Sequence, residues 1–179
     1  MNDLGPSIFI APTLALGLDI LLYVFFAKNV QDKRNYRHYI TVLAVGAFLV
    51  NFIWELAQGP LYEGFEYDWK HISFCGLASI ADMLMVLILF FGIGLMYKNV
   101  FWTKKMGTNK VLLLALVGFL GAILSEFWYI TRGDWSYADT MPLMPFVDVG
   151  VSPVLQFTVL PWLIFLIGRK FINEKNIEM

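Results

Sequence analysis

The sequence predicts an all-α integral membrane protein built as a five-transmembrane-helix bundle, and its composition and hydropathy pattern lead to that prediction. Of its 179 residues, 59% are hydrophobic and only 15% are charged, and the mean hydropathy is +0.66. A soluble domain of this size usually carries about 25% charged residues. One small core cannot bury this many apolar side chains. Lipid must therefore cover part of them.

Five apolar segments account for this excess. A helix needs about 20 largely apolar residues to cross a bilayer, with about 17 as the short limit. The first segment has no Lys or Arg ahead of it, so we expect it to remain as a helix rather than to be removed as a signal peptide. We find no linker and no clear repeat, which predicts a single membrane domain over residues 1–179. The predicted spans are 8–27, 39–60, 72–97, 111–131 and 152–168.

Basic residues are concentrated in alternate loops. Of the thirteen lysines and arginines, only Lys70 and Arg132 lie after the second or fourth span. Cytoplasmic loops of membrane proteins carry an excess of Lys and Arg. The pattern therefore predicts an N-terminus outside and a C-terminus in the cytoplasm.

Acidic residues interrupt four of the spans: Asp19, Glu55, Asp82 and Glu126. An ionised carboxylate at the centre of a membrane helix costs about 3 kcal/mol on insertion scales. Intramembrane acids usually face a bundle interior or a wet cavity and mark sites of function. We therefore take Glu55, Asp82 and Glu126 as candidate catalytic residues.

Further polar side chains share faces with these acids. At 100° per residue, Asn51, Glu55 and Gln58 fall within an arc of about 60° on the second span. On the third span, an arc of about 80° holds His71, Cys75, Ser79 and Asp82. Depth along each helix is compatible with one pocket near the outer side. The candidate substrate-binding residues are Asn51, Trp54, Gln58, His71, Trp128, Tyr129, Gln156 and Asp19.

Each candidate also has an ordinary structural interpretation. Intramembrane Asn, Gln, Ser and acidic side chains can simply hydrogen-bond helices together. Trp54, Trp128 and Tyr129 are also the residue types that gather at membrane interfaces. Gly118 and Gly121 lie on a small-residue face of the fourth span, which close helix packing would explain.

The connection between the fourth and fifth spans is unusually apolar. Residues 131–151 include Trp135, Tyr137 and Phe146, and Pro142 and Pro145 prevent a regular helix. We expect this segment to fold back on the bilayer surface or over the mouth of the bundle. It would then act either as a lid or as an interfacial anchor.

The sequence predicts no cofactor and no metal site. His71 and Cys75 have i, i+4 spacing, but two ligands are too few for a site. Cys75 is the single cysteine, so an internal disulfide is excluded. Nucleic-acid binding has no support, because the basic residues form no groove or motif. The expected partners are the lipid bilayer and a lipophilic small molecule, and the sequence is compatible with a homo-oligomer.

The order of these features resembles the emopamil-binding protein family of sterol isomerases and the wider EXPERA fold, over roughly residues 45–170. In VGAFLVNFIWELAQ, Glu55 stands where the family has the glutamate of its His-x3-Glu pair, and Asn51 stands at the histidine. Asp82 matches an acid of the third helix. FLGAILSEFWYITRGDW resembles the fourth helix, with Glu126 in place of an aspartate, and LQFTVLPWLIFLIGRK resembles the last, with Gln156 in place of a tryptophan.

Two weaker resemblances accompany this one. The Trp54–Glu55 pair is similar to one in small integral-membrane terpene cyclases. The C-terminal half resembles uncharacterised small bacterial multi-pass membrane proteins that carry W-x-Y, MP and a later glutamine. We expect the protein to lie in a bacterial inner membrane.

Three functions remain open at this level. The first is acid–base isomerisation or cyclisation of a lipophilic alkene, an isoprenoid or sterol-like lipid. A carboxyl group shielded from water can keep its proton and act as the acid. The second is a non-enzymatic lipid-binding or membrane-assembly protein, and the third is a proton- or cation-coupled transporter.

Overall fold

The computed structural model describes residues 6–172 and is all-helical over that range, without a strand. Five of its helices are long and apolar enough to cross a membrane, which agrees with a multi-pass membrane protein. They are α1 (Ile10–Asn29), α2 (Lys33–Gln58), α3 (Trp69–Met96), α4 (Thr108–Thr131) and α5 (Val151–Gly168). Short 3-10 helices lie at Pro6–Phe9, Gly59–Leu61, Trp102–Lys105 and Arg169–Phe171.

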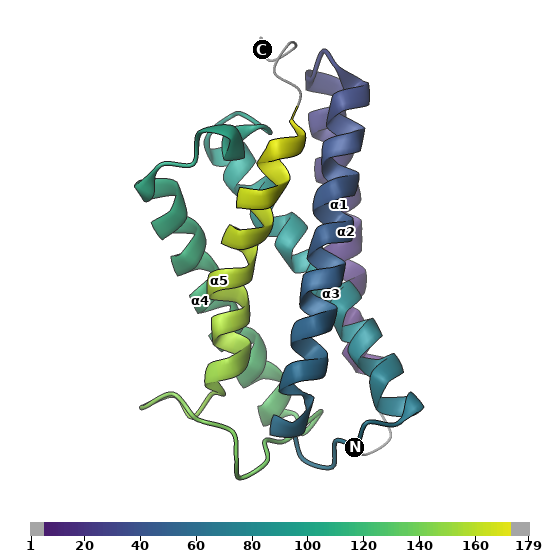
Figure 1. The fold of residues 1–179 in the computed structure, drawn as a ribbon, viewed down its shortest axis with the longest axis vertical. Coiled ribbons are helices and arrows are strands. Elements are labelled where there is room, and N and C mark those ends of the chain that lie inside the picture. Colours follow the sequence, from purple (N-terminus) through teal and green to yellow (C-terminus); the bar gives the residue numbers. More distant parts are fainter. Residues whose placement is uncertain (1–5, 173–179) are drawn as a thin grey trace.

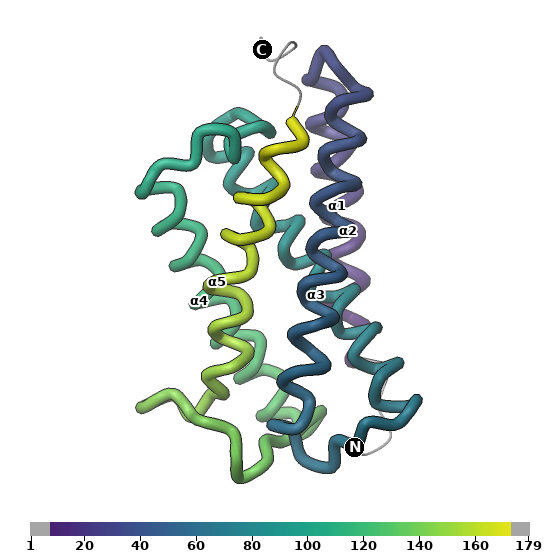
Figure 2. The backbone as a smooth tube through the Cα atoms, in the orientation of Figure 1, coloured from purple at the N-terminus to yellow at the C-terminus, as the bar shows by residue number. Residues whose placement is uncertain are grey.

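The five long helices run up and down, so the start of α1 and the end of α5 lie at opposite ends of the bundle (Figure 1). The most extensive packing joins α2 to α3 and α4 to α5, and α5 also packs along α2. By contrast, α1 packs mainly on α3, and α3 touches α4 at only a few positions. The tube in Figure 2 shows the long connection between α4 and α5 crossing the lower end of the bundle.

The helix boundaries lie close to the predicted spans, and capping aspartates explain the largest difference. Helix α2 begins at Lys33 rather than near residue 39, because Asp32 accepts hydrogen bonds from the backbone N–H groups of Arg34 and Asn35. A capping side chain satisfies N–H groups that the first helical turn leaves free. This cap extends α2 past its apolar part. Asp68 caps α3 in the same way, through the N–H of His71.

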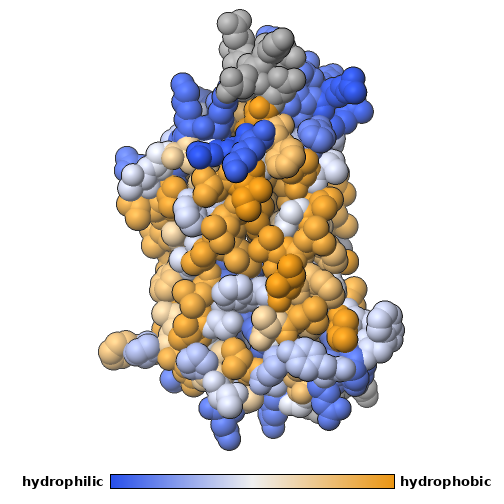
Figure 3. All heavy atoms as spheres, in the orientation of Figure 1, coloured by the Kyte–Doolittle hydropathy of each residue, from blue (hydrophilic) through white to orange (hydrophobic). Residues whose placement is uncertain are grey.

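The surface fits a bilayer. Figure 3 shows an apolar band around the middle of the molecule, with hydrophilic residues gathered at its two ends. Large apolar side chains remain exposed on the helices, such as Leu14, Leu21 and Leu124, each 70% exposed. The end that holds Lys28, Lys104 and Lys105 is called the basic end below, and the opposite end is called the loop end.

An aromatic core fills the bundle near its basic end. Tyr39, Phe90, Trp102 and Phe165 are buried there and their rings contact one another. The indole N–H of Trp102 donates to the Phe90 carbonyl oxygen at 2.9 Å, which fixes the connection between α3 and α4 against α3. Tyr39 hydrogen-bonds Thr103 at 2.5 Å in the same region.

Helices α4 and α5 pack closely where a glycine of α4 meets a carbonyl group that precedes a proline in α5. Pro161 lies inside α5 and has no N–H, so the carbonyl oxygen of Phe157, four residues earlier, loses its helical partner. Gly118 of α4 packs against that carbonyl, and a Cβ at position 118 would overlap it. The close approach of α5 to α4 explains why position 118 is a glycine, as expected for a small-residue face. It does not explain Gly121, where an added Cβ would meet nothing within 4 Å.

This difference predicts opposite effects of the same substitution. Gly118→Ala should lower the free energy of unfolding by about 1–3 kcal/mol, because α4 must move away from the Phe157 carbonyl. Gly121→Ala should leave stability unchanged or raise it, because alanine favours the helix and meets no neighbour. Thermal unfolding of both variants in mild detergent measures the difference. Equal losses of stability would contradict the packing described for Gly118.

Candidate functional site

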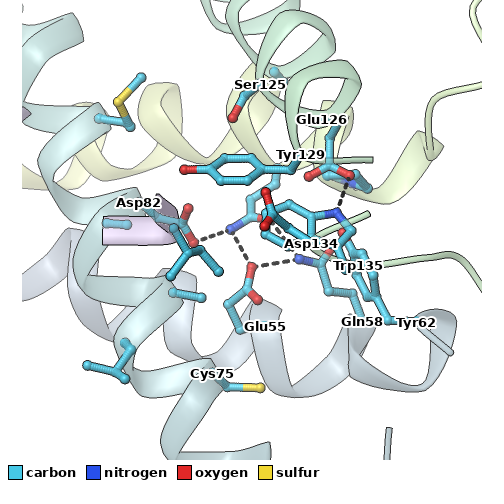
Figure 4. A pocket seen from close by; sticks show the side chains of 18 of the residues that line it. Glu55, Gln58, Tyr62, Cys75, Asp82, Ser125, Glu126, Tyr129, Asp134 and Trp135 are labelled. Atoms are coloured by element: carbon cyan, nitrogen blue, oxygen red, sulfur yellow. Dashed lines mark hydrogen bonds between the residues drawn. The ribbon is translucent and has the colours of Figure 1, made fainter. Parts of the chain in front are cut away.

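A pocket of about 880 Å³ opens inside the bundle on the loop-end side of the aromatic core. All five long helices and the connection after α4 contribute to its wall. Its volume lies within the range of about 300–1,000 Å³ that is usual for ligand sites. Three of the predicted acids line it, Glu55 from α2, Asp82 from α3 and Glu126 from α4 (Figure 4).

The side-chain amide of Gln156 is the centre of the polar network. Its Nε2 lies 2.9 Å from Asn51 Oδ1, 2.9 Å from Asp82 Oδ2 and 3.1 Å from Glu55 Oε1. An amide nitrogen carries two hydrogens, so three acceptors compete for two donors. Two of these acceptors are carboxyl groups, so Glu55 and Asp82 lie close together beside one amide nitrogen.

A second amide, that of Gln58, supports the first. Gln58 Nε2 donates to Glu55 Oε1 at 2.6 Å and to Gln156 Oε1 at 2.9 Å. Its own carbonyl oxygen accepts from the Trp54 indole N–H at 3.1 Å and from the Ser152 hydroxyl at 2.8 Å. Gln58 and Gln156 are buried, whereas Glu55 and Asp82 are partly exposed. The amides therefore hold the two carboxyl groups from behind and leave them facing the cavity.

Glu126 is held separately, by the connection after α4. Its Oε2 accepts from the Tyr137 hydroxyl at 2.6 Å and lies 3.4 Å from the indole nitrogen of Trp135. The ring of Trp135 stacks on Tyr129 with centroids 4.4 Å apart. In Figure 4, Glu126 and Trp135 lie on one side of the view, and Glu55 and Asp82 on the other. The pocket thus presents a carboxyl pair and a single carboxyl group from different helices.

Two phenols near the carboxyl groups remain protonated. Burial raises the pKa of Tyr137, and the neighbouring Glu126 carboxylate raises it further. Burial likewise raises the pKa of Tyr62 well above its usual value, with contributions from Glu126 and Glu55. Both hydroxyl groups therefore remain hydrogen-bond donors throughout the physiological pH range.

The connection between α4 and α5 covers the loop end of the pocket. Tyr62 and Tyr137 form an isolated antiparallel bridge, in which Glu63 N–H donates to Ser136 O and Ala138 N–H donates to Leu61 O, both at 3.0 Å. The later part, residues 142–151, forms a tight hairpin whose Phe146 is fully exposed. Both interpretations of this connection thus have a structural counterpart. Its first half covers the pocket, and its second half presents an aromatic side chain outward.

His71 lines the pocket near the start of α3. Its Nδ1 lies 2.8 Å from Asp68 Oδ1, which also accepts from the His71 backbone N–H. These contacts, led by that backbone N–H, lower the pKa of Asp68. Within residues 6–172, no three His, Cys, Asp or Glu side chains converge closely enough to hold a metal ion.

Most of the predicted site residues come together, and two, Trp128 and Asp19, do not. Asn51, Gln58, Gln156, His71 and Tyr129 lie in the pocket wall or in the network behind it. Trp54 is part of that network through Gln58 but does not line the pocket. Trp128 is 57% exposed and lies under the guanidinium of Arg132 instead.

Asp19 also lies apart from the pocket. It is buried on α1, only 5% exposed, and its carboxyl oxygens have no hydrogen-bond partner within the described part of the chain. The sequence groups Asp19 with the other acids because its depth along the helix is compatible with one shared pocket. The residues of α1 that line the pocket are Ala11, Pro12 and Ala15, and Asp19 lies one turn further along the helix.

Sequence reasoning did not identify Tyr62 and Ser152 as site residues. Tyr62 follows a 3-10 turn rather than a helix, so no helical spacing links it to Glu55. Ser152 lies in the first turn of α5, four residues before Gln156, and that spacing places the two on one face of the helix. For Tyr137 and Trp135, the sequence indicates only that they belong to an apolar connection.

The charge of the pocket is one-sided. No lysine or arginine is among the residues that line it in the described structure, although five carboxyl groups are, those of Glu55, Glu63, Asp82, Glu126 and Asp134. Asp134 has a partner outside the lining, since its Oδ2 lies 3.1 Å from Arg132 Nε. The Glu55–Asp82 pair therefore receives amide hydrogen bonds but no lysine or arginine within the described pocket wall.

We predict that Gln156→Leu destabilises the protein by roughly 2–5 kcal/mol, because it removes the shared donor from Asn51, Glu55 and Asp82. Ser152→Ala is the matched control. It should cost at most about 1 kcal/mol, because Gln58 Oε1 keeps the Trp54 indole N–H. Thermal unfolding in detergent compares the two, and a similar cost for both would show that Gln156 is not the centre of the network.

We also predict that Tyr137→Phe loosens the cover over the pocket. The variant loses the hydrogen bonds from its hydroxyl to Glu126 and from Gly150 N–H, so amide hydrogen exchange across residues 132–150 should accelerate. Tyr67→Phe is the control, because the Tyr67 hydroxyl bonds only the exposed Leu56 carbonyl. Unchanged exchange in Tyr137→Phe would mean that the backbone bridge alone holds the cover.

Comparisons with known proteins identify no relative: no protein-family model, no curated protein and no solved structure matches the chain. The resemblance to the emopamil-binding protein family therefore rests only on the residues quoted above. Any function has to be argued from the chemistry of the pocket.

Proposed function

We propose that the protein binds a lipophilic alkene in the pocket and isomerises or cyclises it by acid–base catalysis. The substrate would be an isoprenoid or sterol-like lipid. One observation carries the proposal. Glu55 and Asp82 accept hydrogen bonds from a single amide nitrogen at the wall of a large cavity, and none of the described residues that line this cavity is a lysine or arginine.

That arrangement suits a proton donor. Two ionised carboxylates so close together would repel each other strongly in a medium of low dielectric constant. A proton between them removes this repulsion, as in other carboxyl pairs that share a site. The pair therefore holds a proton beside the cavity, where a bound double bond could receive it.

The reaction can be written with the groups present. The O–H bond of the Glu55–Asp82 pair breaks, and the π electrons of the alkene form a new C–H bond, which leaves a carbocation on the other carbon. Glu126 then removes a proton from a neighbouring carbon, and that C–H pair forms a shifted double bond. For cyclisation, a second double bond of the same molecule attacks the cation before this proton is lost. No oxidant or reductant is consumed, and the proton on Glu126 returns to the pair between turnovers.

Aromatic rings favour the cationic intermediate. Tyr62, Tyr129 and Trp135 line the pocket near the carboxyl groups. The face of an aromatic ring attracts a cation, and the attraction is larger where water is excluded. The same rings limit the access of water, which would otherwise capture the carbocation.

We place the loop end outside and the basic end in the cytoplasm. Ten of the basic residues in the described chain lie at the basic end, and the positive-inside rule assigns that end to the cytoplasm. The location that we propose is the bacterial inner membrane. The pocket would then lie in the outer half of the bilayer.

A lipid-binding or assembly protein without catalysis is the second candidate. The observation in its favour is the dense hydrogen bonding of Gln156 and Gln58, which would stabilise the bundle even without chemistry. Transport has less support. The buried aromatic core that includes Phe90, Trp102 and Phe165 lies between the pocket and the basic end.

The proposal predicts that deuterium enters a lipid in a carboxyl-dependent way. The purified protein would be incubated in D2O with the neutral lipids of its host, and the lipids would be analysed by mass spectrometry. We expect one deuteron to appear in a specific unsaturated lipid. Asp82→Asn and Glu55→Gln should each reduce the rate at least about 100-fold, which is the usual range for general acid catalysis.

Ser73→Ala is the control, because Ser73 is exposed and bonds only the Trp69 carbonyl. It should label lipid at the rate of the unmodified protein. A lipid that co-purifies unchanged with all four proteins, without deuterium, would favour the non-enzymatic candidate instead.

A further inference from the structure

We infer that the pocket takes an uncharged long-chain lipid directly from the bilayer, through a gap between α3 and α4, and that it excludes lipids with a phosphate head. The inference deepens the proposed function and rests on it for the presence of a lipophilic ligand. Its two parts follow from different observations, the exposure of the pocket wall and its charge.

The gap is apolar and faces the membrane. Met85 of α3 and Val117 of α4 both line the pocket, yet they are 39% and 41% exposed. A residue that lines a cavity and is also exposed marks a place where the cavity reaches the surface. Both residues lie within the transmembrane segments, so the surface that they share with the pocket faces lipid.

The neighbouring residues explain why the helices do not close this gap. Helix α3 presents Ala78 and Ala81 to the pocket, and α4 presents Gly121 and Ser125. Small residues usually let two helices approach closely. Here α3 and α4 contact each other at few positions, and a Cβ on Gly121 would meet open space. The missing side chains therefore leave room for a chain of a ligand.

The pocket is apolar on one side and polar on the other. Towards the basic end its wall is made of Met85, Leu89, Val117, Gly121 and Phe157, while the carboxyl groups lie nearer the loop end. An apolar chain that enters through the gap would lie along the first region. The reactive or polar end of the molecule would reach Glu55 and Asp82.

Charge decides which polar end fits. A phosphate or diphosphate would lie against three carboxyl groups, and no lysine or arginine in the described pocket wall would offset the repulsion. A hydroxyl group, by contrast, can donate to a carboxylate and accept from a protonated carboxyl group. A long-chain alcohol or hydrocarbon therefore fits, whereas phospholipids and prenyl diphosphates do not.

The first test compares two ligands with the same chain. Geranylgeraniol and geranylgeranyl diphosphate would be titrated into the protein in nanodiscs, with tryptophan fluorescence as the signal. We expect the alcohol to bind at least tenfold more tightly. Equal or tighter binding of the diphosphate would overturn the inference, and so would the absence of binding by both.

The second test narrows the gap. Gly121→Phe should weaken binding of geranylgeraniol at least tenfold, and Gly121→Leu should weaken it to a smaller extent. Gly46→Phe is the matched control, because an added Cβ there also meets open space but Gly46 does not line the pocket. Folding is checked by thermal unfolding, and the leucine variant provides the answer if the phenylalanine variant does not fold. Unchanged binding in the folded Gly121 variants would contradict the assigned entrance.

The third test closes the loop end. Glu63 and Ser136 face each other beside the Tyr62–Tyr137 bridge, so a double variant, Glu63→Cys with Ser136→Cys, can form a disulfide there. Binding of geranylgeraniol should proceed at the same rate in the oxidised and reduced forms if the ligand enters from the membrane. Loss of binding on oxidation, with recovery on reduction, would show entry at the loop end and overturn the inference.

These measurements also separate the inference from the proposed function. They detect binding and its rate, which do not depend on turnover. An alcohol that binds as described but gains no deuterium would refute the proposed catalysis alone. Deuterium transfer to a phosphorylated lipid would leave acid–base catalysis in place and refute the inference alone.

Discussion

The Gln156 amide is the contact on which the other polar features of this bundle depend. It reaches Asn51 and Glu55 on α2 and Asp82 on α3, so one side chain joins three helices. In a bilayer core, polar groups that lack partners cost several kcal/mol each, and no water replaces a lost bond. The amide therefore sets the rotation of α2, α3 and α5 together. A turn of any one helix about its axis would take a carboxyl group away from its donor.

Hydropathy predicted most of the fold, because the length of a helix in a membrane is set by the bilayer and not by its neighbours. The five spans were placed within a few residues, except at the start of α2, where a capping aspartate extends the helix beyond its apolar part. The packing could not be predicted in the same way. Gly118 and Gly121 belong to one small-residue face, yet only Gly118 meets a neighbour, because Pro161 frees a carbonyl group on α5 beside it.

The candidate site shows what helical periodicity can and cannot supply. Helical periodicity predicts that Asn51, Glu55 and Gln58 share one face of α2, and in the structure all three belong to one hydrogen-bond network. Periodicity applies within a helix, however, and says nothing about which helices are neighbours. Asp19 was grouped with the other acids by depth alone and lies apart from them. Tyr137 and Trp135 reach Glu126 from an irregular connection, where no repeating angle exists to predict a direction.

Asp19 has a consequence for the biogenesis of the protein. Its burial depends on α3, the helix against which α1 mainly packs, and α3 is synthesised after α1 and α2. During translation, α1 must therefore enter the membrane before the surface that covers its acid exists. The insertion cost of an exposed acid, about 3 kcal/mol at a helix centre, then falls on the otherwise apolar sequence of α1 alone. The marked hydrophobicity of α1, most of whose side chains face lipid in the finished bundle, offsets that cost at the translocon.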